Sequence, residues 1–397
     1  MNSSRWDFYL KISRARARAH FGLALLTVGT GACHADGPTP PAQPLTPVLA
    51  WKVAAPGGGG FEVSTIPVVS PTQFFGVTPR GSIVALNRAT GSLAWTSEPG
   101  DRKSVAKRLL LNGGRLLWAG KSVAGYDIAT GNRIWTYTPA FDTERCDPTV
   151  AGELFIVCME DWTVVALRAS TGEVVWSRAL RDSLAGLPQL VGVAASGDTV
   201  FAAVRQDYSQ SLGFSVALLF ALDRRTGAMM SKTQEGNYTN FIGDIATPTV
   251  SAQNIILSHL LNNRLTAIDR VTSRVAWRFE GEAGWTGFLG PLSIVDGVIY
   301  AASGDRRVYA LDASSGQLRW KSPILEGSQD YAVACGPVVL TWSGVNVRVI
   351  SRATGAFLSL LEYGPAPTYE FTTRPVVDGA DVFLQSSVEI RKMSCGG

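Results

Sequence analysis

The stretch that decides the fold reads Ala310-Leu311-Asp312, continues to Ser315-Gly316 and ends at Trp320. It combines a short hydrophobic strand, a turn whose glycine supplies a positive φ, and a tryptophan four residues later. Related copies, measured at the glycine position, occur at Gly91, Gly131, Gly172, Gly227, Ser273, Gly316 and Gly355, with spacings of 40, 41, 55, 46, 43 and 39 residues. A period of about 40 residues built from short strands predicts stacked four-stranded blades, because one such sheet cannot bury both of its faces alone.

The repeat around residues 291–320 shows how one blade is built. Residues 292–295 and 298–302 are predicted strands joined by Asp296-Gly297, a favoured hairpin turn. Residues 307–311 form the third strand, and the fourth begins at 317–320. The fold class is therefore all-β, a β-propeller of four-stranded antiparallel blades.

Tryptophan recurs at one position of the repeat. Five of the seven turn copies keep it, and Ser231 and Ser359 stand in its place in the other two. The ring is large enough to cover the gap between blades, and its N–H is free to find an acceptor. We expect the following tryptophans to dock one blade on the next: Trp51, Trp95, Trp135, Trp176, Trp277 and Trp320.

The ends of the chain predict how the ring closes. An eighth repeat begins at 374–379 but ends before its fourth strand. A spare strand, residues 47–53 with Trp51, lies at the other end of the domain. We expect this N-terminal strand to complete the C-terminal blade and remove the open sheet edges. This predicts a single eight-bladed propeller over residues 47–397, with seven blades as the alternative.

The first 33 residues are typical of an export signal. A basic segment ending at Arg18 runs into the apolar stretch 21–28, which is too short to span a membrane. Small residues precede Cys33, as in the box at which bacterial lipoproteins are cleaved and lipidated. We predict a lipoprotein-type signal peptide at 1–33, lipidation of Cys33 and a proline-rich tether at 34–46. Cleavage after Ala32 or Ala35, without lipidation, is the alternative.

Charge and cysteine usage agree with an exported protein. The net charge of +4 comes from residues 1–33, and the remainder has 31 basic and 31 acidic residues. A neutral domain argues against nucleic acid as a partner. Cys146 and Cys158 flank a predicted hairpin and are expected to form a disulfide, with two buried thiols as the alternative. Cys335 and Cys395 could not be paired from the sequence.

Patterns that carry catalytic chemistry are missing from the predicted propeller. Its one histidine, His259, lies at the end of a predicted strand and is expected to be a packed side chain. A Ser/His/Asp arrangement is therefore improbable, and no Cys-x-x-Cys-His segment exists. The run 57–60 of four glycines precedes no helix and is not a phosphate loop. We predict no catalytic residue, no metal and no cofactor.

The pattern Ala-Leu-Asp-x-x-Thr-Gly-x-x-x-Trp resembles the pyrroloquinoline-quinone (PQQ) type propeller repeat over about 350 residues. Quinoprotein dehydrogenases share this repeat, but they add an adjacent Cys-Cys pair, which this chain lacks. The branch containing the outer-membrane β-barrel assembly lipoprotein (BamB) is similar in length, leader and blade number. That resemblance implies a monomeric, non-enzymatic scaffold, lipid-anchored at the periplasmic or surface side of the outer membrane, with a protein partner in the cell envelope. The alternatives are a PQQ-dependent oxidoreductase and a surface propeller that binds a ligand or polysaccharide.

Departures from the repeat gather on one predicted face of the propeller. The 55-residue spacing comes largely from residues 205–214, which are predicted to be an inserted loop, and segments 237–241 and 282–288 lie beside it. Aromatic side chains in polar, glycine-rich loops suit protein recognition. The candidate partner-binding residues are Tyr208, Tyr238, Phe241, Trp285 and Phe288. The alternative is that these rings plug the central channel.

Overall fold

The structure is a computed structural model of the chain. It describes residues 46–56, 60–62, 65–98, 108–143, 146–207, 214–239, 245–260, 263–282, 287–288, 290, 292–327, 331–343, 346–362 and 374–396. These belong to a compact unit, Gln43–Gly397, that is separate from Met1–Ala42. The predicted signal peptide, Cys33 and nearly all of the tether lie outside the described residues and stay predictions.

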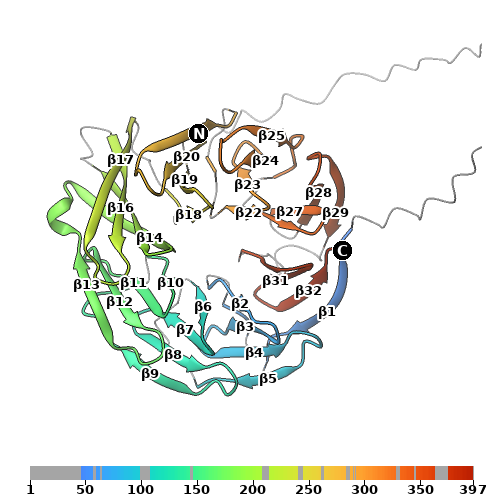
Figure 1. Ribbon diagram of the computed structural model, residues 1–397. Helices are drawn as coiled ribbons and strands as arrows, with labels where there is room; N and C mark the ends of the chain where they lie inside the picture. Colours follow the sequence, from blue (N-terminus) through green and yellow to red (C-terminus); the bar gives the residue numbers. More distant parts are fainter. Residues whose placement is uncertain are drawn as a thin grey trace, which may run out of the picture. The chain divides into compact units, whose positions relative to one another are not determined.

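Eight four-stranded antiparallel sheets make up the unit and form the ring seen in Figure 1. The first four blades are β2 (Val68–Val69), β3 (Gln73–Val77), β4 (Ile83–Asn87), β5 (Leu93–Thr96); β6 (Leu109–Asn112), β7 (Arg115–Ala119), β8 (Val123–Asp127), β9 (Arg133–Tyr137); β10 (Thr149–Ala151), β11 (Leu154–Cys158), β12 (Thr163–Arg168), β13 (Val174–Ala179); and β14 (Leu187–Ser196), β15 (Thr199–Asp207), β16 (Phe214–Asp223), β17 (Met229–Thr239).

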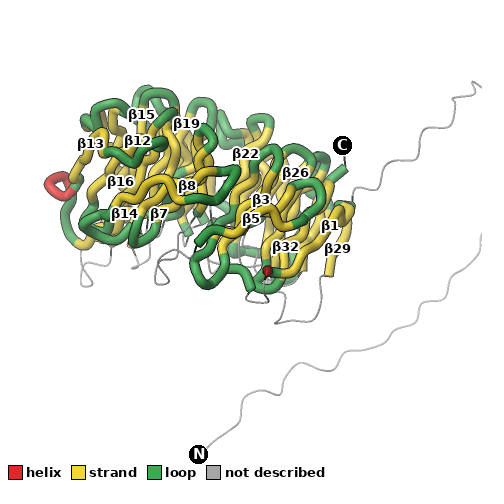
Figure 2. Tube along the Cα trace, turned by 90° about the horizontal axis from the view of Figure 1, so that it is seen from below, coloured by secondary structure: helices red, strands yellow, loops and turns green. Residues whose placement is uncertain are grey.

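The second four are β18 (Thr249–Val250), β19 (Asn254–His259), β20 (Arg264–Asp269), β21 (Val275–Glu280); β22 (Ser293–Val295), β23 (Val298–Ser303), β24 (Arg307–Asp312), β25 (Leu318–Lys321); β26 (Ala332–Cys335), β27 (Val338–Ser343), β28 (Asn346–Ser351), β29 (Phe357–Glu362); and β30 (Val376–Asp378), β31 (Asp381–Gln385), β32 (Glu389–Ser394), β1 (Val48–Ala54). We number these blades 1 to 8 in this order. Figure 2 shows that the described part consists of strands and loops with almost no helix.

The ring closes as predicted, with eight blades rather than seven. β1 is the outermost strand of blade 8 and pairs antiparallel with β32, in a register that sets Val48 opposite Ser394 and Ala54 opposite Glu389. Side chains then join blade 8 to blade 1. The rings of Phe74 and Phe383 stack with centroids 5.5 Å apart, and Arg88 forms ion pairs with two aspartates of blade 8. Both ends of the domain are therefore held in one sheet.

Each repeat tryptophan docks its blade on the turn of the next one. Its indole Nε1 donates a hydrogen bond to a backbone carbonyl there, and its ring covers the turn glycine. A Cβ on Gly172, for example, would lie 2.5 Å from the ring of Trp135. The bonds are Trp51 to Arg88 (2.9 Å), Trp95 to Ile128 (3.2 Å), Trp135 to Ala169 (3.0 Å), Trp176 to Arg224 (2.7 Å), Trp277 to Ala313 (3.3 Å) and Trp320 to Arg352 (2.9 Å).

The two repeats without tryptophan explain this arrangement further. Ser231 of blade 4 meets blade 5, whose turn has Ser273 instead of glycine, and the two hydroxyl oxygens lie 2.7 Å apart. Ser359 of blade 7 meets blade 8, whose two outer strands are not joined by a turn. Tryptophan is thus present where the next blade offers a glycine turn. Tryptophan and glycine form one packing unit, because a side chain at the turn would occupy the space of the ring.

Among the described residues, no helix is long and apolar enough to cross a membrane.

Candidate functional site

Blade 4 is longer than its neighbours. Its strands β14 to β17 have 10, 9, 10 and 11 residues. The segment 205–214 was predicted to be a loop, but residues up to Asp207 continue β15 and Phe214 already belongs to β16. The reason is that the antiparallel ladder simply continues, with Asp207 opposite Ser215. The prediction was wrong for residues 205–207 and 214, which lengthen the blade, whereas residues 208–213 lie outside the described residues.

The structure describes only some of the aromatic residues predicted to contact a partner. Tyr208, Phe241 and Trp285 lie outside the described residues. Tyr238, expected in a loop, is part of β17 and its backbone lies opposite Ser215. These four stay predictions as partner contacts.

Phe288 requires a correction. Its side chain is completely buried and packs edge-on against Tyr309, with ring centroids 5.5 Å apart. An isolated bridge between its backbone and Ser303 holds it at blade 6, so that the ring lies in the core shared by blades 5 and 6. A side chain in that position cannot contact a partner. The prediction failed because glycine-rich sequence on both sides made the segment read as an exposed loop.

A pocket of about 370 Å³ opens between blades 3 and 4, beside the end of β15. It lies at the end of blade 4 where β15 ends at Asp207 and β16 begins at Phe214. Its lining combines an aromatic ring, sulfur-containing side chains and charged groups. The lining residues are Asp142, Cys146, Met159, Glu160, Trp162, Pro188, Gln189, Leu190, Arg205 and Asp207.

Trp162 is the central aromatic residue of this pocket. Its φ of 66° is in the left-handed region, which is unusual for a large side chain. The strained backbone carries the indole across the blade boundary, where Nε1 donates to the carbonyl of Pro188 at 2.9 Å. The guanidinium of Arg181 lies 5.1 Å above the ring. Strain of this kind persists only where the surroundings impose it, and it is common at binding sites.

The pocket carries more negative than positive charge. Arg205 and Asp207 form an ion pair with the two groups 3.1 Å apart, and both side chains are partly buried. Asp142 and Glu160 add two further carboxylates, and their backbones are joined by a 2.9 Å hydrogen bond from the Glu160 N–H to the Asp142 carbonyl oxygen. Three carboxylates of the lining therefore stand against the guanidinium of Arg205 and that of Arg181 over the Trp162 ring. Such a pocket suits a ligand group that is cationic and partly apolar.

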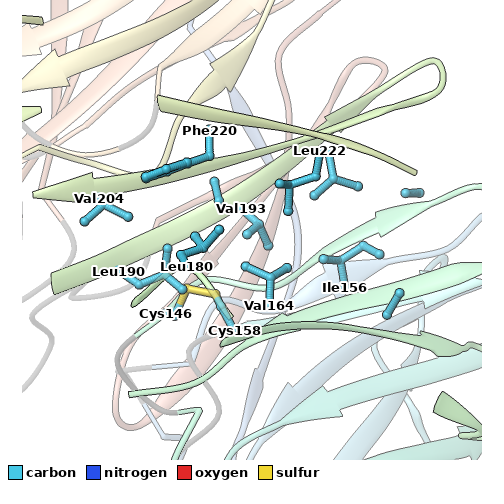
Figure 3. Packing of buried hydrophobic residues seen from close by; sticks show 14 of the residues in the cluster. Cys146, Ile156, Cys158, Val164, Leu180, Leu190, Val193, Val204, Phe220 and Leu222 are labelled. Atoms are coloured by element: carbon cyan, nitrogen blue, oxygen red, sulfur yellow. A yellow bond between two sulfur atoms is a disulfide. The ribbon is translucent and has the colours of Figure 1, made fainter. Parts of the chain in front are cut away.

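A disulfide stabilises the pocket floor. The predicted pairing of Cys146 with Cys158 is confirmed, with Cα atoms 5.8 Å apart. Figure 3 shows this bond among Leu180, Leu190 and Val193, between the sheets of blades 3 and 4. Because these blades share one core, the bond fixes the wall from which Trp162 projects.

A second disulfide joins Cys335 of β26 to Cys395 after β32, and the Cα atoms are again 5.8 Å apart. The sequence alone left this pair unassigned. It links blade 7 to the end of the chain, where blade 8 closes the ring.

His259 is a packed side chain, as expected. It is fully buried, and burial lowers its pKa to about 4. Its Nε2 lies 3.2 Å from the Thr266 hydroxyl, which in turn donates to Glu235 at 3.1 Å. Arg278 completes the network with two bonds to Glu235, at 2.8 and 2.7 Å. Within the described ranges, no group of three or more His, Cys, Asp or Glu side chains could hold a metal ion.

The chain matches the family described as outer membrane protein assembly factor BamB, over residues 46–279 and 215–391. It belongs to this family. BamB from Burkholderia pseudomallei is 25% identical over 344 residues, covering 82% of this chain and 83% of the relative. Quinoprotein ethanol dehydrogenase from Pseudomonas putida is 27% identical over 175 residues, which are 39% of this chain and 28% of that enzyme.

Among solved structures, BamB from Moraxella catarrhalis matches with a TM-score of 0.65 and 16% identity, over 88% of this chain and 98% of that one. At this identity the likeness concerns the fold. The family thus accounts for the repeats and the ring. The sequence prediction did not include Trp162, although its position outside the repeat, in a polar connection, was an available signal.

Proposed function

We propose that this protein is an envelope scaffold that binds a partner protein, resembling the BamB subunit of the outer-membrane protein assembly machinery, and that it has no catalytic activity of its own. Membership of the BamB family supports the role. The observation that carries the proposal is the pocket between blades 3 and 4, beside the end of β15 in the lengthened blade 4. The protein is expected to be exported and held at the outer membrane through lipid on Cys33.

The chemistry of the pocket indicates what a partner would insert. The strained Trp162 offers an aromatic face, and the excess of carboxylates attracts a cation. Arg181 already lies over the Trp162 ring, so a lysine or arginine of the partner would pack its aliphatic part at the edge of the indole and place its charge beside Asp207. Tyr208 and Phe241, which follow β15 and β17 in the sequence, stay candidate partner residues.

Site-specific photo-crosslinking in the native envelope tests this assignment. A photoreactive amino acid at exposed Glu160 should capture the barrel-assembly protein. The same probe at Arg225, an exposed residue of the turn at the other end of blade 4, should not. Equal capture from both positions would contradict the proposed face.

Charge reversal gives a matched second test. Asp207→Lys should weaken partner binding at least tenfold, because it places a cation where the partner's basic group binds. Asp198→Lys changes charge equally on the far end of the blade, where the native carboxylate pairs with Arg224 at 2.7 Å, and should leave binding unchanged. Dye reduction by the purified protein with added PQQ and Ca²⁺ would overturn the scaffold in favour of an oxidoreductase.

Two controls address localisation. Metabolic labelling with a palmitate analogue should mark the wild type and not Cys33→Ala. Labelling of neither protein would mean ordinary cleavage without a lipid anchor.

A further inference from the structure

Two arginines approach the centre of the propeller from different blades. Arg108 directly precedes β6, and Arg374 lies two residues before β30, so each stands at the start of an innermost strand. In Figure 1 the innermost strands β6, β10, β18 and β22 face the middle of the ring. The central cavity here has a volume of about 190 Å³ and is lined by Arg108, Thr149, Val193, Ala194, Ala195, Thr247, Pro248, Thr249, Val250, Leu292 and Arg374.

The two guanidinium groups experience each other's charge. Burial and, as a smaller contribution, the positive charge of Arg108 lower the pKa of Arg374 to about 10. Burial also lowers the pKa of Arg108. Both shifts mean that the protein, as it stands, solvates these cations less well than water does. Two like charges in such a place favour a negatively charged companion.

The carboxylate that acts on both arginines only partly supplies that companion. Asp147 raises the pKa of each guanidinium, but its Oδ2 already accepts a hydrogen bond from the Thr247 hydroxyl. Among the residues that the structure describes, this one carboxylate acts on two guanidinium groups, which leaves one positive charge unbalanced. Donor capacity also remains, because Arg108 Nε is buried without a hydrogen-bond partner, while Arg374 Nη2 donates to the carbonyl of Leu292 at 3.2 Å.

We propose that the central cavity binds a small anion with a phosphate or carboxylate group, held by Arg108 and Arg374. The planar guanidinium matches the oxygen spacing of both groups. The volume is below the roughly 300–1,000 Å³ of pockets for drug-sized ligands, which limits the occupant to a small ion. This inference is independent of the proposed partner surface, since that pocket lies between blades 3 and 4 and has the opposite charge.

Calorimetric titration of the mature protein tests the proposal. Inorganic phosphate and malonate are titrated separately at pH 7 in chloride buffer of constant ionic strength. The wild type should bind at least one of them saturably at one site per chain, and the tighter of the two identifies the headgroup. Arg108→Gln and Arg374→Gln should each lower the affinity at least tenfold. Arg225→Gln, which removes an exposed arginine whose side chain is 74% accessible, should bind like the wild type.

A structural role alone would give a different pattern. If a glutamine variant does not fold, as judged by circular dichroism, the lysine variant at the same position keeps the charge without the planar fork. It should still bind, but more weakly than the wild type. The proposal would be overturned if neither anion bound saturably. It would also be overturned if binding survived in both arginine variants, because the anion would then bind elsewhere.

Discussion

The tryptophan–glycine unit between blades leads to a quantitative prediction at Gly172. This residue has φ of +77°, and a Cβ placed there would lie 2.5 Å from the Trp135 ring. Gly172→Ala therefore adds two costs: about 1–2 kcal/mol for a side chain in the left-handed region, and about 1–3 kcal/mol for overpacking the ring. We expect the free energy of unfolding to fall by about 2–5 kcal/mol.

Gly114 provides the matched control. It has φ of +78°, yet a Cβ there would meet nothing within 4 Å. Gly114→Ala should therefore cost only the backbone term of about 1–2 kcal/mol. The two variants differ in packing and hardly in backbone geometry.

A double-mutant cycle separates the ring from the backbone. In a Trp135→Ala background the space above Gly172 is vacant, so Gly172→Ala should again cost only about 1–2 kcal/mol. Urea unfolding followed by circular dichroism measures all variants, with the m-value checked for constancy. Equal losses at Gly172 and Gly114, or a Gly172→Ala cost that does not depend on Trp135, would refute the docking argument.

Two further predictions concern the disulfides and acid stability. Replacing Cys335 and Cys395 by serine removes a cross-link between residues 60 positions apart in the sequence. The Cys146–Cys158 cross-link joins residues 12 positions apart. The chain-entropy model predicts that the free energy of unfolding falls by about 4 kcal/mol without Cys335–Cys395 and by about 3 kcal/mol without Cys146–Cys158. Denaturation of the two double variants should give this order, and the reverse order would contradict it. The pKa of His259 is about 4 in the folded protein, below its ordinary value of 6.5, so the unfolded chain binds more protons between these pH values and stability falls on acidification. The loss reaches roughly 3 kcal/mol, and His259→Gln should flatten this part of the stability curve, whereas an unchanged slope would refute the assignment.

The repeat explains how much of the fold was predictable. Strand positions follow from alternating hydrophobic residues and glycine turns, and the unfinished repeat at the C-terminus required the N-terminal strand. Pairing of Cys335 with Cys395 could not be predicted, because the contact depends on how blade 7 meets the closing blade. Phe288 was misplaced for a related reason. Whether a loop aromatic faces water or the next blade depends on neighbours that local sequence does not specify.

The candidate site was harder to predict than the fold, because the residues that distinguish it do not follow the repeat. Where blade 4 meets blade 5, serine replaces both tryptophan and glycine, and a polar network on Glu235 replaces aromatic packing. Blade 4 is also the longest blade and forms one wall of the pocket with Trp162.

At seven blade boundaries the next blade has a turn on which a tryptophan could dock. Only the boundary between blades 4 and 5 lacks the tryptophan–glycine unit there. Across this boundary, Glu235 of the long strand β17 forms an ion pair with Arg278 of β21. Blade 4 therefore combines these departures from the repeat with one wall of the pocket. Blade 4 is accordingly where the search for a partner should begin.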